Sequence, residues 1–207
     1  MVDDETLTRA IDGDEAAQRA LYEAHHAAAL RLAYLLLQDT CDAEEVVQDA
    51  FVYVFRNLAR YEPERGSFWA WLRVVLVSRC RNSRRRRRLH VLSLETLDAA
   101  GRGPASPKSR GDPERALELR GTRRAVWTAL QQVSAGARDA LVLRYYEELS
   151  YAEIAAALGC SPDAARSRVA YGKTQLRRLL AEPERGEARS LAISHRGDVP
   201  SRGETGF

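Results

Sequence analysis

The sequence predicts an all-α protein of two small helical domains joined by a flexible linker, the second ending in a helix-turn-helix. Apolar residues recur every three or four positions along most of the chain, and no stretch shows sustained strand alternation. A segment rich in Gly, Pro and Ser interrupts this pattern before residue 113. We therefore expect domains over residues 1–92 and 114–182, a linker over 93–113 and a disordered polar tail over 183–207.

The composition is that of a soluble globular protein, with 207 residues, 45% of them hydrophobic and 29% charged. No apolar run approaches the roughly 18–20 residues that cross a membrane, and the acidic start "MVDDETLTRA" is unlike a secretory signal. We expect no membrane insertion and a cytoplasmic location. Cys41, Cys80 and Cys160 lack metal-binding or disulfide spacing, so we interpret them as structural thiols and expect no metal or cofactor.

Charge is divided sharply along the chain. Residues 1–64 contain 14 acidic residues and 5 arginines, a net charge of −9. Residues 65–90 contain 9 arginines and no acid, and five of these form the run Arg84 to Arg88. This division predicts two different partners, one of which is itself anionic.

The first domain is predicted to contain four helices. Gly13 divides the pattern from Leu7 to Leu37 into a short helix and a long one. Asp42 is expected to cap a third helix from about Ala43 to Arg60. Its predicted buried face is Val47, Ala50, Phe51, Val54 and Leu58. A second face carries Glu45, Gln48, Asp49 and Arg56.

A loop from Tyr61 to Ser67 precedes the fourth helix, because Pro63 and Gly66 both interrupt helix. Ser67 is expected to cap this helix. Its apolar side is Phe68, Trp71, Leu72, Val75 and Leu76. Trp69 lies off that side, and the arginine run closes the helix.

The second domain begins with predicted helices over Glu114–Gln132 and "AGARDALVLRYYEE". Ser150 and Glu153 form a capping box, and Gly159 fits the left-handed residue that ends a helix. Ser161 caps the next helix, with a proline at its first position. Two helices joined by so short a turn are typical of motifs that present the second helix to a DNA major groove.

That second helix divides by angle into a core face and an exposed face. The core face is Ala165, Val169, Gly172, Leu176 and Leu179, and the opposite face is Asp163, Arg166, Ser167, Ala170 and Thr174. Arg168, Tyr171, Lys173, Arg177 and Arg178 lie at the flanks, within reach of phosphates. An arginine on the exposed face can bond guanine O6 and N7 in bidentate fashion.

An enzyme acting on nucleic acid is disfavoured. The sequence contains no paired carboxylates at metal-binding spacing, no phosphate-cradling glycine loop and no plausible nucleophile pair. His25 and His26 are expected on a solvated helix surface. A helix-turn-helix regulator that binds duplex DNA alone remains an alternative, although it does not explain the charge division.

Four segments in order resemble a bacterial RNA polymerase sigma factor of the extracytoplasmic-function type (group IV of the sigma-70 family). They are "GDEAAQRALYEAH", "DAEEVVQDAFVYVFRNL", "FWAWLRVVLVSRCRNSRRRRR" and "YYEELSYAEIAAALGCSPDAARSRVAYGKTQLRRLL". The resemblance covers roughly Leu7–Leu180. Departures from the family pattern are Gln18, Ser78, Asn82, Ala164, Ala165 and Tyr171. Promoter sequence therefore cannot be borrowed from other members.

The resemblance implies binding to core RNA polymerase, with the third helix on the β′ coiled coil and the second domain on the β flap. The implied polymerase-binding residues are Glu45, Gln48, Asp49 and Arg56. Those implied for the promoter −10 element are Tyr61, Arg65, Ser67, Trp69, Ser78, Arg79, Asn82, Arg84 and Arg85. Those implied for the −35 element are Ser161, Asp163, Arg166, Ser167, Arg168, Ala170, Tyr171 and Lys173. An anti-sigma factor is a further expected partner.

Overall fold

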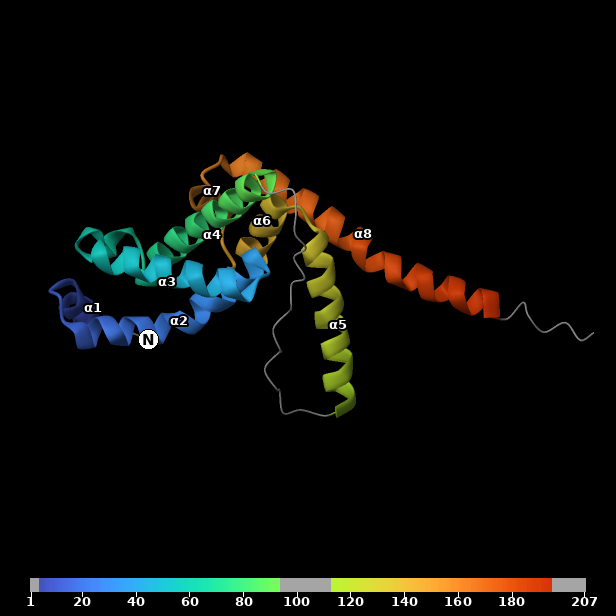
Figure 1. The fold of residues 1–207 in the computed structure, drawn as a ribbon, viewed down its shortest axis with the longest axis horizontal. Coiled ribbons are helices and arrows are strands. Elements are labelled where there is room, and N and C mark those ends of the chain that lie inside the picture. Colours follow the sequence, from blue (N-terminus) through green and yellow to red (C-terminus); the bar gives the residue numbers. More distant parts are fainter. Residues whose placement is uncertain (1–3, 94–112, 195–207) are drawn as a thin grey trace, which may run out of the picture.

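The computed structural model describes residues 4–93 and 113–194, with side chains for 5–87 and 121–181. Over these residues the chain forms helices and short turns and no strand, which confirms the all-α prediction (Figure 1). None of the described helices is both long and apolar enough to cross a membrane.

The first domain contains four helices and two 3₁₀ turns. In chain order these are α1 (Asp4–Ile11), α2 (Glu15–Leu37), α3 (Thr40–Arg56), η1 (Leu58–Arg60), η2 (Pro63–Arg65) and α4 (Phe68–Ser93). The predicted break at Gly13 is confirmed, since this residue has a φ of 91°. Asp14 then caps α2 by accepting the backbone N–H groups of Ala16 and Ala17.

The start of α3 differs from the prediction. Asp39, rather than Asp42, is the N-cap, and its carboxylate accepts the Asp42 backbone N–H at 2.9 Å. The helix consequently begins at Thr40, and Asp42 is buried inside its first turn. The predicted buried face is confirmed, because Val47, Ala50, Phe51, Val54 and Leu58 are all buried. The Ser67 cap of α4 is also confirmed by its bond from the Ala70 N–H, at 3.2 Å.

The second domain contains α5 (Pro113–Gln132), α6 (Ala135–Tyr145), α7 (Tyr151–Leu158) and α8 (Pro162–Ser194). The capping box of Ser150 and Glu153 and the left-handed Gly159, with φ of 58°, are both present. Ser161 accepts from the Ala164 N–H at 3.2 Å, as predicted. Helix α8 is described to Ser194, while residues 94–112 of the predicted linker and 195–207 of the predicted tail lie outside the described residues.

Helix α8 is seated on α6 through a glycine. A Cβ placed on Gly172 would lie 2.8 Å from Leu141 Cδ1 and 3.3 Å from Ala137 Cβ. The missing side chain therefore lets the two helices approach closely. This contact fixes which face of α8 points outward.

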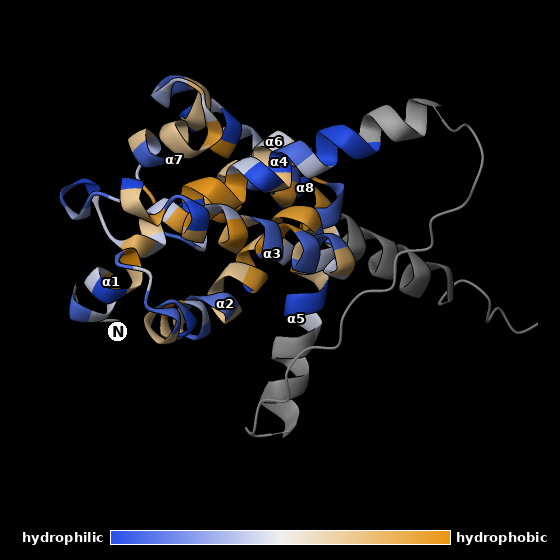
Figure 2. Cartoon of the chain, turned by 60° about the vertical axis from the view of Figure 1, so that its left-hand side comes forward, coloured by the Kyte–Doolittle hydropathy of each residue, from blue (hydrophilic) through white to orange (hydrophobic). Residues whose placement is uncertain are grey.

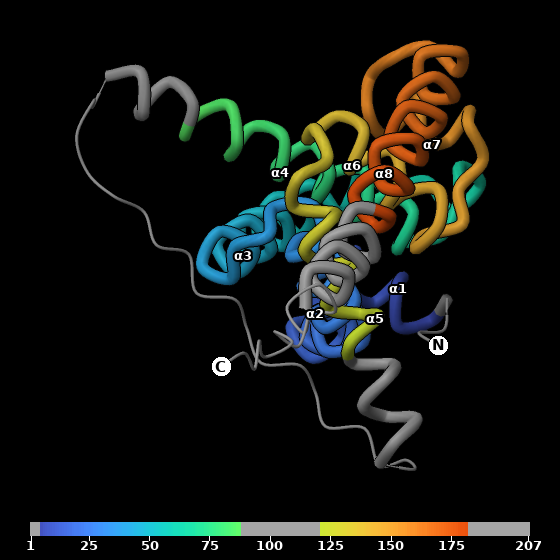
Figure 3. The backbone as a smooth tube through the Cα atoms, turned by 90° about the vertical axis from the view of Figure 1, so that its right-hand side faces the viewer, coloured from blue at the N-terminus to red at the C-terminus, as the bar shows by residue number. Residues whose placement is uncertain are grey.

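The two domains pack against each other, a contact that the sequence did not predict. Helix α4 contacts α7, and α2 contacts α6. Figures 1 and 3 show α4 passing beside the helices of the second domain, and Figure 2 shows hydrophobic residues gathered where the helices meet. The rings of Tyr34 and Trp127 stack across the contact at a centroid distance of 4.6 Å.

The three cysteines have different surroundings. Cys80 is fully buried, and burial raises the pKa of its thiol to about 12, which fits a structural role. Cys41 is exposed, so its surroundings differ from those of buried Cys80.

Candidate nucleic-acid and polymerase interface

The outer face of α3 carries the predicted polymerase-binding residues. Glu45, Gln48, Asp49 and Arg56 are all exposed, on the side opposite the buried face. Two apolar side chains that were not predicted as site residues, Val52 and Tyr53, are 49% and 39% exposed in the same part of α3. Val52 follows Asp49 by three residues and precedes Arg56 by four, so it lies on the same face of the helix as these two charged residues. An exposed apolar residue framed by charge is the composition of a protein-binding surface.

A groove of about 190 Å³ separates α3 from α4. Arg79 Nη1 reaches across it to Asp49 Oδ2 at 3.6 Å, and the Arg79 guanidinium lies 5.1 Å from the centre of the Tyr53 ring. Glu45 and Asn82 also line this groove. The structure thus brings two predicted polymerase-binding residues beside two predicted −10 residues.

The loop before α4 is held by its own side chains. Tyr61 donates its hydroxyl to the Gly66 carbonyl at 2.9 Å and packs its ring against Phe68 and Trp71. Arg65 pairs with Glu62 at 2.6 Å. A groove of about 350 Å³ opens beside this loop, and its far wall comes from the second domain, including Leu149, Glu153, Ala156 and Ala157.

Helix α4 has an outward face and an inner face besides its buried one. Ser78, Asn82 and Arg85 are exposed on the outward face, together with Val74, which is 41% exposed. The structure therefore brings three predicted −10 residues to one solvent-facing surface. Trp69, Arg73, Arg81 and Arg84 form what we call the inner face, because each contacts the second domain.

At one end of the inner face, Glu147 receives two donors. Trp69 Nε1 donates to Glu147 Oε2 at 3.0 Å, and Arg73 Nη1 donates to the same oxygen at 3.3 Å. The Trp69 ring also stacks on His25, with centroids 6.0 Å apart and planes 12° from parallel. His25 is half-buried, so its expected solvated position is wrong, and burial lowers its pKa.

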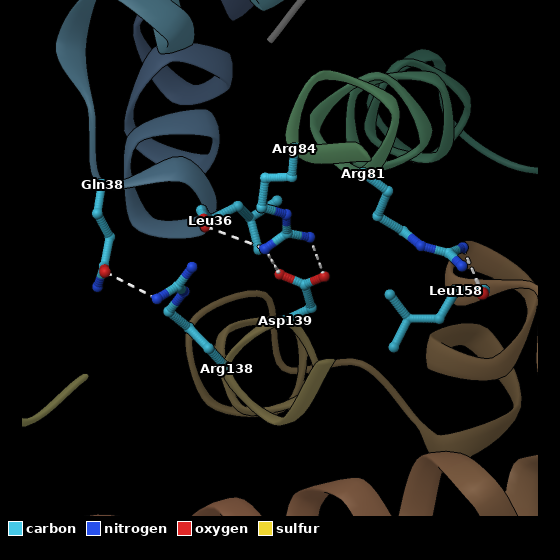
Figure 4. A network of polar contacts seen from close by, with 7 residues as sticks. All are labelled: Leu36, Gln38, Arg81, Arg84, Arg138, Asp139 and Leu158. Carbon is cyan, nitrogen blue, oxygen red and sulfur yellow. Dashed lines mark hydrogen bonds and ion pairs between the residues drawn. The ribbon is translucent and has the colours of Figure 1, made fainter. Parts of the chain in front are cut away.

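At the other end, Arg84 is held by α6 (Figure 4). Its Nη1 donates to Asp139 Oδ1 at 2.8 Å and to the Leu36 carbonyl at 3.3 Å, and its Nη2 contacts Asp139 Oδ2. Nearby, Arg138 donates to Gln38 Oε1 at 2.8 Å, and Arg81 donates to the Leu158 carbonyl. Asp139 is 2% exposed. A carboxylate buried to this extent requires a partner for its charge.

The residues of the second domain that make these contacts were not predicted as site residues. The adjacent charges Arg138 and Asp139 interrupt the apolar run of "AGARDALVLR", which is the one sequence signal for them. Farther along the run, Arg87 contacts Asp42 and lies 3.8 Å from Asp39 Oδ2. Burial raises the pKa of Asp42, and the neighbouring Arg87 opposes that shift.

Helix α8 presents the exposed face that its sequence predicted. Asp163, Arg166, Ser167 and Ala170 are exposed, while Ala165 and Val169 are buried. The Arg166 guanidinium lies 5.4 Å from the centre of the Tyr151 ring, whose other neighbour is Arg144 at 5.1 Å. The arginine thus has an aromatic surface beside it at the edge of the exposed face.

The predicted flanking residues of α8 differ in what they contact. Tyr171 is 57% exposed, and its hydroxyl accepts from Gln175 Nε2 at 3.0 Å. Arg168 borders a groove of about 400 Å³ that Arg84 and Arg85 also line. Lys173 lines an apolar groove between domains, so it is set apart from the exposed face.

The chain matches two known families in order. Residues 21–90 match "Sigma-70 region 2" and residues 123–176 match "Sigma-70, region 4". It is 33% identical to the ECF RNA polymerase sigma factor SigE of Mycolicibacterium smegmatis over 91% of this chain and 73% of that protein. It is 31% identical to the RNA polymerase sigma factor CarQ of Myxococcus xanthus over 88% of this chain and all of that protein.

Solved structures have the same fold. The sigma factor RpoE of Bartonella quintana, crystallised with the anti-sigma factor NepR, aligns with a TM-score of 0.64 and 23% identity over 79% of this chain and 96% of that one. CnrH, solved with the cytosolic domain of CnrY, aligns with a TM-score of 0.59 and 25% identity over 88% of this chain and 99% of that one. Both sigma regions, in family order and with relatives matched over most of their length, show that the chain belongs to the extracytoplasmic-function RNA polymerase sigma factors.

Proposed function

We propose that this sigma factor binds core RNA polymerase and directs promoter-specific initiation by recognising a −10 and a −35 element. The observation that carries the proposal is the presence of both sigma regions in one chain, each with an exposed surface suited to its task. The outer face of α3 would take the β′ coiled coil, because it combines charge with exposed Val52 and Tyr53. The second domain would bind the β flap.

The −10 element would be held by helix α4 and the loop before it. Single-stranded DNA needs aromatic surfaces for stacking and cations along the backbone. Tyr61 and Trp69 supply the former, and the arginines of α4 supply the latter. Duplex DNA at −35 would be read by Arg166 and its exposed neighbours on α8, flanked by phosphate contacts from Arg168.

Run-off transcription with core polymerase tests the proposal. We expect specific transcripts from a linear genomic library only when the chain and core polymerase are both present. A helix-turn-helix regulator would instead bind duplex DNA alone and leave core polymerase unable to initiate. Absence of initiation on every fragment would overturn the sigma-factor proposal.

An anti-sigma factor is a further proposed partner, supported by the solved relative RpoE, which was crystallised with the anti-sigma factor NepR. CnrH was also solved as a complex, with the cytosolic domain of CnrY. Sigma factors act by binding and are not enzymes. Action on polymerase and chromosomal DNA would place the protein in the cytoplasm.

A further inference from the structure

We propose that the groove of about 400 Å³ between α4, α6 and α8 binds a compact anion that carries at least two phosphate groups, such as the diphosphate of a free nucleotide. We call it the arginine groove. Both domains line it, through Arg81, Arg84, Arg85, Ser134, Ala135, Gly136, Asp139, Leu158 and Arg168. Its volume lies within the roughly 300–1,000 Å³ of ligand pockets. Such a site is additional to polymerase and promoter binding.

The charge of the groove is the first reason. Four of its nine lining residues are arginines, and Asp139 is the one acid among them. The Asp139 carboxylate is already paired with Arg84. Arg81 donates to a backbone carbonyl of α7, which carries no charge, and Arg85 and Arg168 form no ion pair among the described residues. Three guanidinium charges therefore meet in one groove without a carboxylate to balance them.

The arginines of α4 are also held in place before any ligand arrives, as Figure 4 shows for Arg81 and Arg84. Arg84 is fixed by Asp139 and by the Leu36 carbonyl, and Arg81 by the Leu158 carbonyl. A side chain that is already ordered loses less conformational entropy when it binds. A guanidinium has five N–H donors, so the contact with Leu158 leaves N–H groups of Arg81 for an anion.

The start of α6 supplies a second kind of donor. Ser134 is the N-cap residue, but its side chain makes no capping hydrogen bond. The first N–H groups of a helix have no partner within the helix. At Gly136 an added Cβ would meet no atom within 4 Å, so the backbone here is open to the groove. These N–H groups add to the attraction that the arginines provide for an anion.

The shape of the groove indicates the class of ligand. Its lining contains no aromatic side chain on which a base could stack, so it would recognise phosphate and not the base. One phosphate pairs with one guanidinium in bidentate fashion, whereas two linked phosphates can engage arginines of α4 and α8 together. A DNA strand instead presents its charges in a long row. Cations that converge on a concave site from two domains suit a compact anion better.

Calorimetric titration of the full chain with inorganic pyrophosphate, without divalent cations, tests the site. We expect one anion for each chain, bound at least about tenfold more tightly than inorganic phosphate, which can engage fewer guanidinium groups. Arg85→Gln and Arg168→Gln should each weaken pyrophosphate binding at least about fivefold, because each removes charged hydrogen bonds. Equal affinities for the two anions would overturn the proposal.

Matched controls remove the same charge outside the groove. Arg86→Gln lies one residue along α4 from Arg85, and Arg177→Gln lies on α8 with Arg168; both side chains are exposed. Each control should change pyrophosphate affinity by less than about twofold, because surface charges at a distance are screened by salt. If all four variants lose affinity equally, the attraction is that of a basic surface and no site exists.

Gly136→Asp tests the groove without removing an arginine. An acidic residue in the first turn of a helix favours the helix, so the variant should fold, which far-UV circular dichroism verifies. Its carboxylate would stand among the arginines and lower pyrophosphate affinity at least about tenfold. Gly136→Asn adds a side chain of the same size without the charge and should lose much less. Equal affinities of these two variants would contradict an anion site at this position.

The arms of a last experiment separate a free anion from DNA, because Arg84, Arg85 and Arg168 were also predicted to contact the promoter. The second probe is a single strand of about 20 nucleotides without terminal phosphates. Gly136→Asp should weaken it no more than Gly121→Asp, an exposed position of α5 with no atom within 4 Å of an added Cβ. A Gly136→Asp variant that loses the oligonucleotide and keeps pyrophosphate would overturn the proposal. Failure of run-off transcription would contradict the sigma-factor function and leave the pyrophosphate result standing.

Discussion

Helices α4 and α8 are both predicted to contact DNA, but Arg84 of α4 and Arg166 of α8 differ in their exposure to solvent. Arg166 of α8 points into solvent, because the opposite face of that helix is seated on α6 through Gly172. Arg84 of α4 instead forms a bidentate ion pair with Asp139 of the other domain. The position of a residue around the helix axis therefore predicts whether it faces the core or the surface of its own domain. Which part of that surface stays accessible depends on the neighbouring domain.

The largest expected effect comes from replacing Arg84 to Arg88 with glutamine. Each lost phosphate contact on a single strand lowers the slope of log affinity against log salt by about 0.7, so five contacts would remove about 3.5. We expect a smaller decrease, because Arg84 and Arg87 are already paired with acidic residues within the chain. Titration of a labelled oligonucleotide at several salt concentrations measures the slope, and a shift in sequence preference would contradict the assignment to phosphates.

Arg166→Ala tests the exposed arginine of α8 in the same way. A bidentate contact to guanine is worth about 1–3 kcal/mol of discrimination, so the variant should lose preference at one −35 position. Selection from a randomised −35 library with polymerase present measures this. Arg177→Ala, at the flank of α8, is the matched control and should weaken all sequences alike.

Gly172→Ala tests the seating of α8. Crowding against Leu141 should cost about 1–3 kcal/mol, partly offset by the roughly 1 kcal/mol by which alanine favours helix. We expect a net loss of stability in urea unfolding. Gly136→Ala in α6, where an added Cβ has no neighbour within 4 Å, should not destabilise the protein. Equal effects of the two variants would show that the close approach to Leu141 is unimportant.

Tyr151→Leu probes the aromatic surface beside Arg166. Loss of a cation–π contact costs about 0.5–1 kcal/mol at an exposed site, so discrimination by Arg166 should decrease by roughly two- to fivefold. Tyr151→Phe keeps the ring and should retain the preference. If leucine and phenylalanine behave alike, the ring does not position the arginine.

The smallest effect concerns His25 beside Trp69. Burial lowers the pKa of His25 in the folded chain below its ordinary 6.5, so the unfolded chain binds more protons between the two values. Stability should therefore decrease as pH is lowered through about 6.5 and become independent of this residue once both states are protonated. His25→Phe should reduce that dependence in urea unfolding at several pH values, and an unchanged profile would assign it to other groups.

Much of the fold could be predicted because its signals are local. The break at Gly13, the caps at Ser67, Ser150 and Ser161, and the left-handed Gly159 depend on neighbours within a few residues. The one misplaced cap was Asp42, where two aspartates three residues apart can each accept a backbone N–H. In the structure Asp39 accepts the backbone N–H, whereas Asp42 lies inside the first turn and contacts Arg87 from a distant part of the chain.

The all-α class, the faces of α3 and α8 and the family follow from the sequence. That Trp69 and Arg84 contact Glu147 and Asp139 follows only from how the two domains pack. These partners are separated by 78 and 55 residues, and a long-range ion pair leaves no periodic pattern in either helix. The spacing of apolar residues along a helix predicts the face that is buried in its own domain. Contact between domains depends instead on how two surfaces are placed, and each of these surfaces is polar enough to face water.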